Sequence, residues 1–468
     1  MAKSPPPIVY IFLVLLLGGG GWYFYRSGSL SLPTISLPWG GGVNTLSDGE
    51  KVLLPDPQNP SKVAAAELIK QGNLAAAIPV LQAAVQANRN DPEALIYLNN
   101  ALAEQQGDPL VLGVAVPIST NPDRARETLR GVAQAQQQFA QKGGVQNRLL
   151  QVVVADDGDN PNQAKAVASA FIRRKDVLGV LGHSSSQTAL AAGPLYQESP
   201  LAMISSTNTS TEISALGDAI FRVVPSDQIA GTQLARYALN QLRAKSVAIF
   251  YNAQDAYSNS LRNAFSTTIL TEGGQIAGEY DLAQSGFAAT TALQAAVAAG
   301  SQAVFLAPNG ATAPQSLEVA RANAALSKRL PLLGGDVLFS FTTLKEGGSA
   351  VQGLVVAIPW HPLLPGNRAF AQRAEQQWGG QVSWRTALAY DATQVFLAAI
   401  TRSGSAISRE AILQALNAPN FSVTETASGP IRFLPSGDRE GSNILVQVKP
   451  GQRSGTGFDF IPLSTVPQ

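Results

Sequence analysis

The sequence of 468 residues contains no cysteine and only two histidines, His183 and His361. The missing thiols exclude disulfides, cysteine nucleophiles, thiolate metal sites and a lipid-modified N-terminal cysteine. Two histidines are too few for a histidine-rich metal centre. We therefore expect a folded, non-redox chain without a metal or other cofactor.

Charged residues are also scarce, at 14% of the chain, and 33 Lys and Arg against 32 Asp and Glu give a formal net charge of +1. No block of basic residues concentrates positive charge locally, so a nucleic-acid partner is not expected. Hydrophobic residues make up 45% of the sequence. A chain of this length can form more than one domain, because a single core rarely grows beyond about 250–300 residues.

One uncharged run, Ile8 to Tyr25, lies between Lys3 and Arg26. As an α-helix it would be about 27 Å long, just enough to span the hydrocarbon core of a membrane. The aromatic residues Trp22 to Tyr25 are typical of a membrane interface. We favour an uncleaved anchor in residues 1–30. The alternatives are a cleaved signal peptide, although no A-x-A-like cleavage site follows the apolar stretch, or a buried segment of a soluble protein.

Residues 31–60 are rich in Pro, Gly and Ser, which indicates a linker. Residues 61–108 change to an alanine-rich pattern that predicts three helices, capped by Ser61, Asn73 and Asp91. Pro79 should disturb the middle helix. This segment resembles about one and a half tetratricopeptide (TPR) repeats. It is either a helical spacer or a small module that docks a protein partner, and so short an array should pack on a neighbour.

From residue 110 onward, short apolar runs alternate with amphipathic helical stretches. We expect strands at 111–118, 149–157, 177–183, 200–205, 220–224, 246–251, 276–281, 302–307, 330–335 and 353–358. Strands that are apolar throughout and are joined by helices indicate buried parallel sheets. The sequence therefore predicts an α/β fold with two doubly wound lobes, preceded by a small all-α segment. Ligands of such sheets bind beyond the carboxyl ends of the strands.

Residues 110–463 resemble the periplasmic binding proteins for branched-chain amino acids, the Leu/Ile/Val-binding family, both in the order of their segments and in the local sequence of each segment. Five stretches carry the resemblance: 155–172, 177–213, 220–237, 246–265 and 330–340. The resemblance implies a type I periplasmic binding fold with three hinge crossings. Lobe one would take about 110–226 and 354–430, and lobe two about 227–353 and 431–463.

The same resemblance implies a function. The chain would be the extracytoplasmic substrate-binding component of an ABC transporter, capturing an amino acid or amino-acid-like solute by hinge closure. Its partner would be a membrane permease. It would lie on the periplasmic side of the inner membrane, anchored by residues 8–25, or free in the periplasm if the N-terminal segment is cleaved.

Residues 184–188 are rich in hydroxyl groups and lie between an expected strand and an expected helix. The free backbone N–H groups at the start of a helix, together with the helix dipole, favour binding of a carboxylate. By resemblance, Ser186 holds the ligand's α-carboxylate, with Gln187 beside it; the alternative for Ser186 is a simple N-cap. The Thr207 carbonyl and the Thr209 hydroxyl would bind the amino-acid head, unless this is an ordinary polar loop.

Three further site residues lie on lobe two. A buried ammonium needs a carboxylate, and Asp336 stands where the family places one, although it could instead be a cap or turn former. By resemblance Tyr257 closes over the ligand and Asn309 is another contact.

Other residues are expected to be structural. His183 is not in a G-x-S-x-G motif, so an amidase-type enzyme is not expected and no catalytic residue is assigned. Asp156, Asp157 and Asp159 lack the spacing of a calcium loop and predict a solvated turn. Trp360, Trp378 and Trp384 are expected in the core.

The alternative function is a regulatory or interaction protein of the cell-wall synthase activator or sensor type, which uses the same fold with helical repeats. A transcription regulator would need an N-terminal helix-turn-helix, and the apolar run stands there instead.

Overall fold

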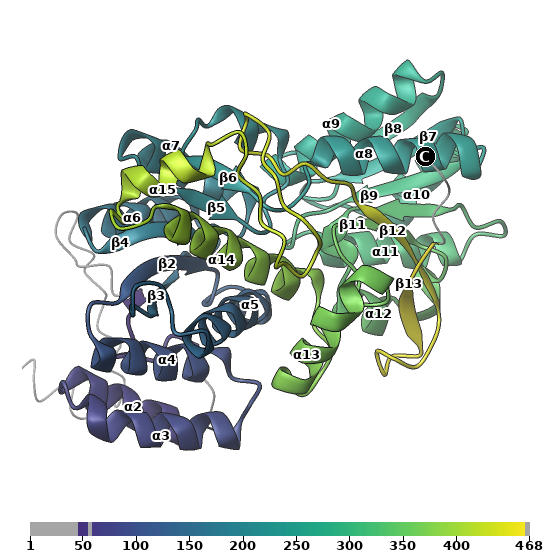
Figure 1. Cartoon of the computed structure of the whole chain (residues 1–468). Helices are drawn as coiled ribbons and strands as arrows, with labels where there is room; N and C mark the ends of the chain where they lie inside the picture. Colours follow the sequence, from purple (N-terminus) through teal and green to yellow (C-terminus); the bar gives the residue numbers. More distant parts are fainter. Residues whose placement is uncertain (1–44, 55–58, 464–468) are drawn as a thin grey trace, which may run out of the picture. The chain divides into compact units, whose positions relative to one another are not determined.

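The computed structural model describes residues 45–54 and 59–463 (Figure 1). The predicted anchor at residues 8–25 lies outside the described residues. In the described ranges, no helix combines the length and the hydropathy that crossing a membrane requires.

The first sheet has six strands in the order β1-β3-β2-β4-β5-β6. Its central strands β2 and β3 are buried at almost every position, which explains their unbroken apolar runs. All neighbours pair in parallel except β1, which lies antiparallel to β3. The strands are β1 (Leu46–Ser47), β2 (Leu110–Val116), β3 (Leu150–Asp156), β4 (Val177–Leu181), β5 (Met203–Ser205) and β6 (Ile220–Arg222). Its helices are α5 (Pro122–Gln141), α6 (Pro161–Arg173), α7 (Ser186–Glu198), α13 (Arg368–Trp378), α14 (Trp384–Arg402) and α15 (Arg409–Leu416).

The second sheet has seven strands in the order β13-β12-β11-β10-β9-β7-β8. Five of them are parallel, while β12 and β13 run antiparallel at one edge. The strands are β7 (Ser246–Tyr251), β8 (Gln275–Asp281), β9 (Ala303–Ala307), β10 (Leu332–Gly334), β11 (Val355–Ile358), β12 (Ile444–Pro450) and β13 (Phe458–Pro462). The helices are α8 (Asp227–Arg236), α9 (Ala256–Thr271), α10 (Ala289–Ala298), α11 (Ala313–Ala324) and α12 (Phe341–Gly347). The predicted two-lobed α/β fold is confirmed.

The chain crosses between the sheets three times, but two crossings lie later than expected. Strand β11 is hydrogen-bonded to β10 and β12, so the second crossing follows Ile358 instead of preceding residue 354. The third crossing follows Asp438, which pairs with β6 and binds the buried Arg222 guanidinium at 2.6 Å. An apolar strand can belong to either sheet, so the hydrophobic pattern could not assign β11 to a lobe. Asp438 lies beside β6 because its carboxylate pairs with the buried Arg222 guanidinium.

Residues 60–106 form three helices, α2 (Pro60–Lys70), α3 (Leu74–Ala87) and α4 (Pro92–Gln106), beside the edge of the first sheet (Figure 1). Helix α4 packs on α5 and β3. The buried Asn100 carboxamide accepts a hydrogen bond from Val152 N at 2.8 Å and donates one to Val152 O at 2.7 Å. This side chain therefore pairs with the open edge of β3 as a neighbouring strand would.

Two local predictions for this segment were wrong. Helix α2 begins earlier than expected, with Asn59 as N-cap and Pro60 in the first turn, so Ser61 is inside the helix. Helix α3 continues through Pro79. Pro79 and Ala75 are both exposed, so water can satisfy the Ala75 carbonyl that loses its helical partner. Asn73 and Asp91 cap α3 and α4 as predicted.

A buried ion cluster joins α2 to α4 and to the linker. Lys62 Nζ lies 2.7 Å from Asp91 and 3.0 Å from Glu93, and it donates to Leu54 O at 2.8 Å. Glu93 also accepts the N–H of Leu53 at 2.7 Å. Burial raises the pKa of Glu93 and the charge of Lys62 opposes this effect. Removing the ammonium would leave two carboxylates without their cation in a dry site.

We expect Lys62→Met to lower the free energy of unfolding by about 3–5 kcal/mol, because it breaks a buried ion cluster from one side. The matched control is Lys70→Met on the same helix, whose ion pair with Glu67 is 63% and 59% exposed and should matter little. Urea unfolding followed by circular dichroism measures both. Equal midpoints for the two variants would show that the cluster does not stabilise the fold.

Candidate functional site

The loops that follow β4 and β5 bring the hydroxyl-bearing residues together. Ser185, not Ser186, is the N-cap of α7 and forms a capping box with Thr188. Ser186 is buried in the first turn, and its Oγ accepts a hydrogen bond from Ser210 N at 3.3 Å. Thr207 Oγ1 donates to Ser184 O at 2.8 Å, which ties the two loops together. Gln187 is exposed on α7.

Thr209 faces a residue that the sequence analysis did not select. The Thr209 carbonyl accepts the N–H of Asp227, the first residue of α8, at 2.8 Å. The Thr209 hydroxyl and one carboxylate oxygen of Asp227 are both buried without a hydrogen bond of normal geometry in the described part of the chain, although the hydroxyl is close enough to lower the pKa of that carboxyl group. Unsatisfied buried polar atoms of this kind mark a place where a ligand or water completes the site.

Two predicted residues of lobe two are in direct contact. Tyr257, on α9, donates its hydroxyl proton to Asp336 Oδ1 at 2.6 Å. Gly335 makes this approach possible, because a Cβ there would lie 2.3 Å from the Tyr257 hydroxyl oxygen. Asn309 has a different role: its Nδ2 donates to Asp255 at 3.1 Å and its Oδ1 accepts Thr312 N at 3.0 Å. It therefore braces the N-cap of α9 and the loop after β9.

Thr209, Asp227 and Asp336 line one small cavity of about 10 Å³ between the two lobes. A space of this size admits about one water-sized group. Burial raises the pKa of Asp227 to about 7, with the Thr209 hydroxyl opposing this rise and the charge of Asp336 contributing to it. Burial also raises the pKa of Asp336, against the Tyr257 hydrogen bond and the charges of Arg385 and Arg124. Two carboxyl groups held this way are ready to take a small cation such as an ammonium group.

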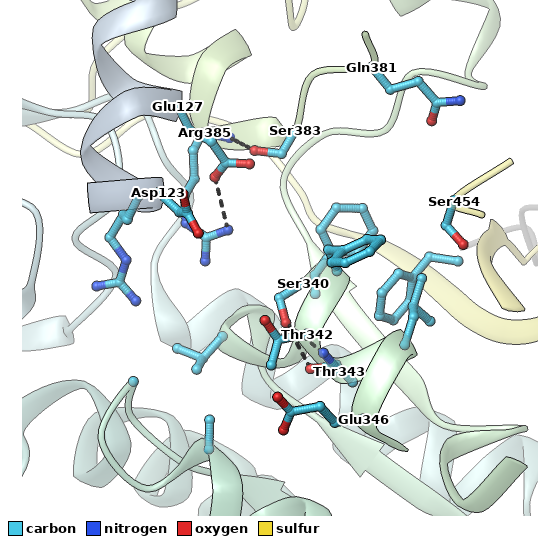
Figure 2. A pocket seen from close by; sticks show the side chains of 18 of the residues that line it. Asp123, Glu127, Ser340, Thr342, Thr343, Glu346, Gln381, Ser383, Arg385 and Ser454 are labelled. Atoms are coloured by element: carbon cyan, nitrogen blue, oxygen red, sulfur yellow. Dashed lines mark hydrogen bonds and ion pairs between the residues drawn. The ribbon is translucent and has the colours of Figure 1, made fainter. Parts of the chain in front are cut away.

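A second, larger cavity of about 660 Å³ adjoins the same loop, since Val337 and Phe339 line it. Figure 2 shows Asp123, Glu127 and Arg385 on one side and Ser340, Thr342 and Thr343 on another. The first group lies near the N-termini of α5 and α14, and the second at the start of α12. The volume is that of a site for a small organic molecule.

The acidic turn of Asp156, Asp157 and Asp159 is only partly solvated: Asp159 is exposed, as expected, but Asp157 is not. Asp157 is fully buried, and its Oδ2 lies 2.8 Å from Nδ1 of the equally buried His183, whose Nε2 contacts the Tyr196 hydroxyl at 3.1 Å. Helix α6 is capped by Asn160 instead. His183 is structural, as expected, and the three tryptophans Trp360, Trp378 and Trp384 are buried. In the described residues no group of acidic and histidine side chains could hold a metal ion.

A family model described as "Periplasmic binding protein" matches residues 109–453. The chain belongs to this family. It is 25% identical to the Leu/Ile/Val-binding protein of Escherichia coli strain K12 over 360 residues, covering 74% of this chain and 92% of that protein. It is 30% identical to an amino acid binding protein of Pseudomonas aeruginosa over 157 residues, which is 33% of this chain and 42% of that relative. The lobes match an ABC transporter substrate-binding protein from Desulfitobacterium hafniense in complex with Leu (TM-score 0.64, 25% identity, 76% of this chain and 100% of that chain).

Two site-lining residues of this binding protein were missed for different reasons. Asp227 follows the N-cap Ser226 of α8 and had the sequence signature of an ordinary helix start. Arg124, which lines the large cavity, lies in the helix after β2. Its position near the carboxyl end of a central parallel strand was the available signal, because ligands collect at that edge.

The pKa of about 7 for Asp227 predicts how stability depends on pH. Its ordinary value is 3.8, so the folded chain keeps a proton that the unfolded chain loses above pH 4, and stability falls as pH rises from about 4 through 7. Asp227→Asn should remove this dependence. Between pH 5 and pH 8 we expect the variant to lose about 2 kcal/mol less stability than the unaltered chain.

The measurement is urea unfolding at several pH values without ligand. Asp123→Asn is the control, because the Asp123 side chain is 92% exposed. Asp391, with a pKa of about 6, adds the same slope to every chain compared. Parallel stability curves for Asp227→Asn and the unaltered chain would contradict the assignment.

Proposed function

We propose that the chain is the extracytoplasmic substrate-binding component of an ABC transporter, which captures an amino acid or amino-acid-like solute between its lobes. The observation that carries the proposal is the contact of Tyr257 with Asp336 beside Asp227 and Thr209, at the carboxyl ends of both sheets. The printed names of relatives support it, since one is a Leu/Ile/Val-binding protein and another was solved with Leu.

In this proposal the carboxyl groups of Asp336 and Asp227 receive the solute's ammonium group, and the Thr209 hydroxyl completes its hydrogen bonds. The first turn of α7 with Ser186, and the loop with Thr207, receive the α-carboxylate, because free N–H groups at a helix start favour anions. Tyr257 and Asp336 come from lobe two, so hinge closure brings them onto a head already bound to lobe one. Gln187, exposed on α7, and Asn309, which braces the loop after β9, are not among the residues that line either cavity.

The partner in this proposal is a membrane permease that recognises the ligand-bound form, and the location is the periplasmic side of the membrane, held by residues 8–25. The exposed faces of α2 and α3 remain available for a protein partner of the TPR-like segment. A regulatory protein without a solute is the alternative. The cavity of about 660 Å³ favours the solute-binding function, because its volume is that of a small-molecule site.

The test is a thermal-shift screen of the full chain against the common amino acids, urea and short amides. A solute at 100 times its Kd should add about 2.7 kcal/mol of stability. Asp336→Asn should abolish the shift, because the amide cannot balance the ammonium charge.

Glu104→Gln is the control for this test, since it makes the same change of carboxylate to amide at an exposed position on α4. A shift that survives Asp336→Asn would overturn the ammonium assignment. A screen without any hit would favour the regulatory alternative.

The anchor is tested by fractionation. The full chain should stay with the membranes after alkaline extraction, and arginine at both Leu15 and Leu16 should release it, because each charge in the bilayer centre costs about 2.5–3.5 kcal/mol. Arginine at Leu30 and Leu32, outside the apolar run, is the control. A soluble chain with a shortened N-terminus would show a cleaved signal peptide instead.

A further inference from the structure

The guanidinium of Arg124 lines the large cavity without a partner of its own. Arg124 is half-buried near the start of α5, and no hydrogen bond or ion pair of its side chain exists in the described part of the chain. It reaches towards lobe two, because a Cβ at Gly310, in the loop after β9, would lie 3.6 Å from Arg124 Nη2. A guanidinium group that reaches across the cleft without an ion pair is positioned to bind an anion there.

The acidic residues around the cavity do not serve Arg124. Asp123 pairs with Arg126 at 2.9 Å, and Glu127 lies 3.6 Å from Arg385. Asp459 accepts two backbone N–H groups, from Arg453 at 2.9 Å and Ser454 at 2.7 Å. Each of these three carboxylates therefore has donors elsewhere. Asp159, Asp336 and Glu127 act on Arg124 only through their electric field, and none forms an ion pair with it in the described residues.

The electrostatic surroundings favour an anion further. Helices α5, α14 and α11 all contribute first-turn residues to the cavity lining, and a helix N-terminus carries partial positive charge. At α11 the N-cap Thr312 makes no side-chain capping bond, so its first-turn N–H groups are not capped by a side chain. Burial lowers the pKa of Arg124, and the nearby charge of Arg385 adds to this effect. The charges of Asp159, Asp336 and Glu127 oppose this lowering, and an anion in the cavity would act in the same direction.

The cavity is within reach of a ligand whose head is bound at Asp336. Asp336 lines the small cavity, whereas Val337, the next residue, and Phe339 line the large one. The charges of Arg124 and Arg385 also act on Asp336. One amino-acid-like molecule can therefore place its ammonium group at Asp336 and extend its side chain towards Arg124.

We propose that Arg124 is a specificity-determining residue that binds a second anionic group of the solute. The preferred ligands are then amino acids with a carboxylate in the side chain. This inference rests on the proposed function. A charge-assisted hydrogen bond to Arg124 then distinguishes these solutes from neutral amino acids of the same size. Gly310 and Ala313, which line the cavity, have small side chains or none, and this leaves room for the side chain of a dicarboxylic amino acid.

The experiment is isothermal titration calorimetry of the full chain with two matched pairs of probes, glutamate against glutamine and 2-aminoadipate against norleucine. The dicarboxylic member of each pair should bind at least about tenfold more tightly, the effect of one hydrogen bond to a charged group. Arg124→Gln should remove this preference, so that the two members of each pair bind with equal affinity. Arg126→Gln is the matched control, because it removes the same charge from the same helix at a residue that pairs with Asp123.

Rising salt provides a measurement that does not depend on the variant folding. In the unaltered chain it should weaken binding of the dicarboxylic probes more than that of the neutral ones. If neutral amino acids bind as tightly as their dicarboxylic partners, and Asp336→Asn abolishes that binding, the inference about Arg124 is overturned and the proposed function stands. If no amino acid binds at all, both are overturned.

Discussion

Two carboxyl groups share a dry site where the two lobes meet, and much of the proposed chemistry depends on this constraint. Asp227 and Asp336 cannot both be ionised there at low cost without a cation, because burial and mutual repulsion disfavour the charged forms. The hydrogen bond from Tyr257 satisfies one acceptor of Asp336, and the Thr209 hydroxyl lowers the pKa of Asp227. In the proposed function, an ammonium group supplies the positive charge that lets both carboxyl groups ionise, and this gain favours the closed arrangement of the lobes.

The framework around this site holds its own charges more completely. At the crossings, Arg222 binds Asp438 and the Ser214 hydroxyl, and Asp391 accepts the N–H groups of Ala427 and Ser428. These buried polar contacts satisfy the irregular backbone where the chain passes between the lobes.

The regular elements could be predicted closely where one principle decided them. Helix α7 begins in the hydroxyl-rich stretch that the sequence places between a strand and a helix, because a capping box starts it there. Prediction failed where a local rule competed with tertiary surroundings. Pro79 does not break α3, because the affected carbonyl faces solvent. Strand β11 belongs to lobe two, and the prediction missed this because an apolar parallel strand has the same sequence pattern in either sheet. The helical segment was recognised, but its attachment through Asn100 to Val152 depends on two residues far apart in the sequence.

The sequence by itself determined the alternation of strands and helices, the absence of thiol chemistry and the hydroxyl-rich loops after β4 and β5, because these depend on composition and local periodicity. It also supplied Asp336 and Tyr257 as candidates, through resemblance. Tertiary structure decided the rest. Only the three crossings bring Asp227 and Thr209 to Asp336, and only the approach of α5 to the loop after β9 leaves Arg124 in the cleft without an ion pair in the described residues. Burial and the distance to an opposite charge are properties of the folded chain, and they decide which carboxylates and guanidinium groups await a ligand.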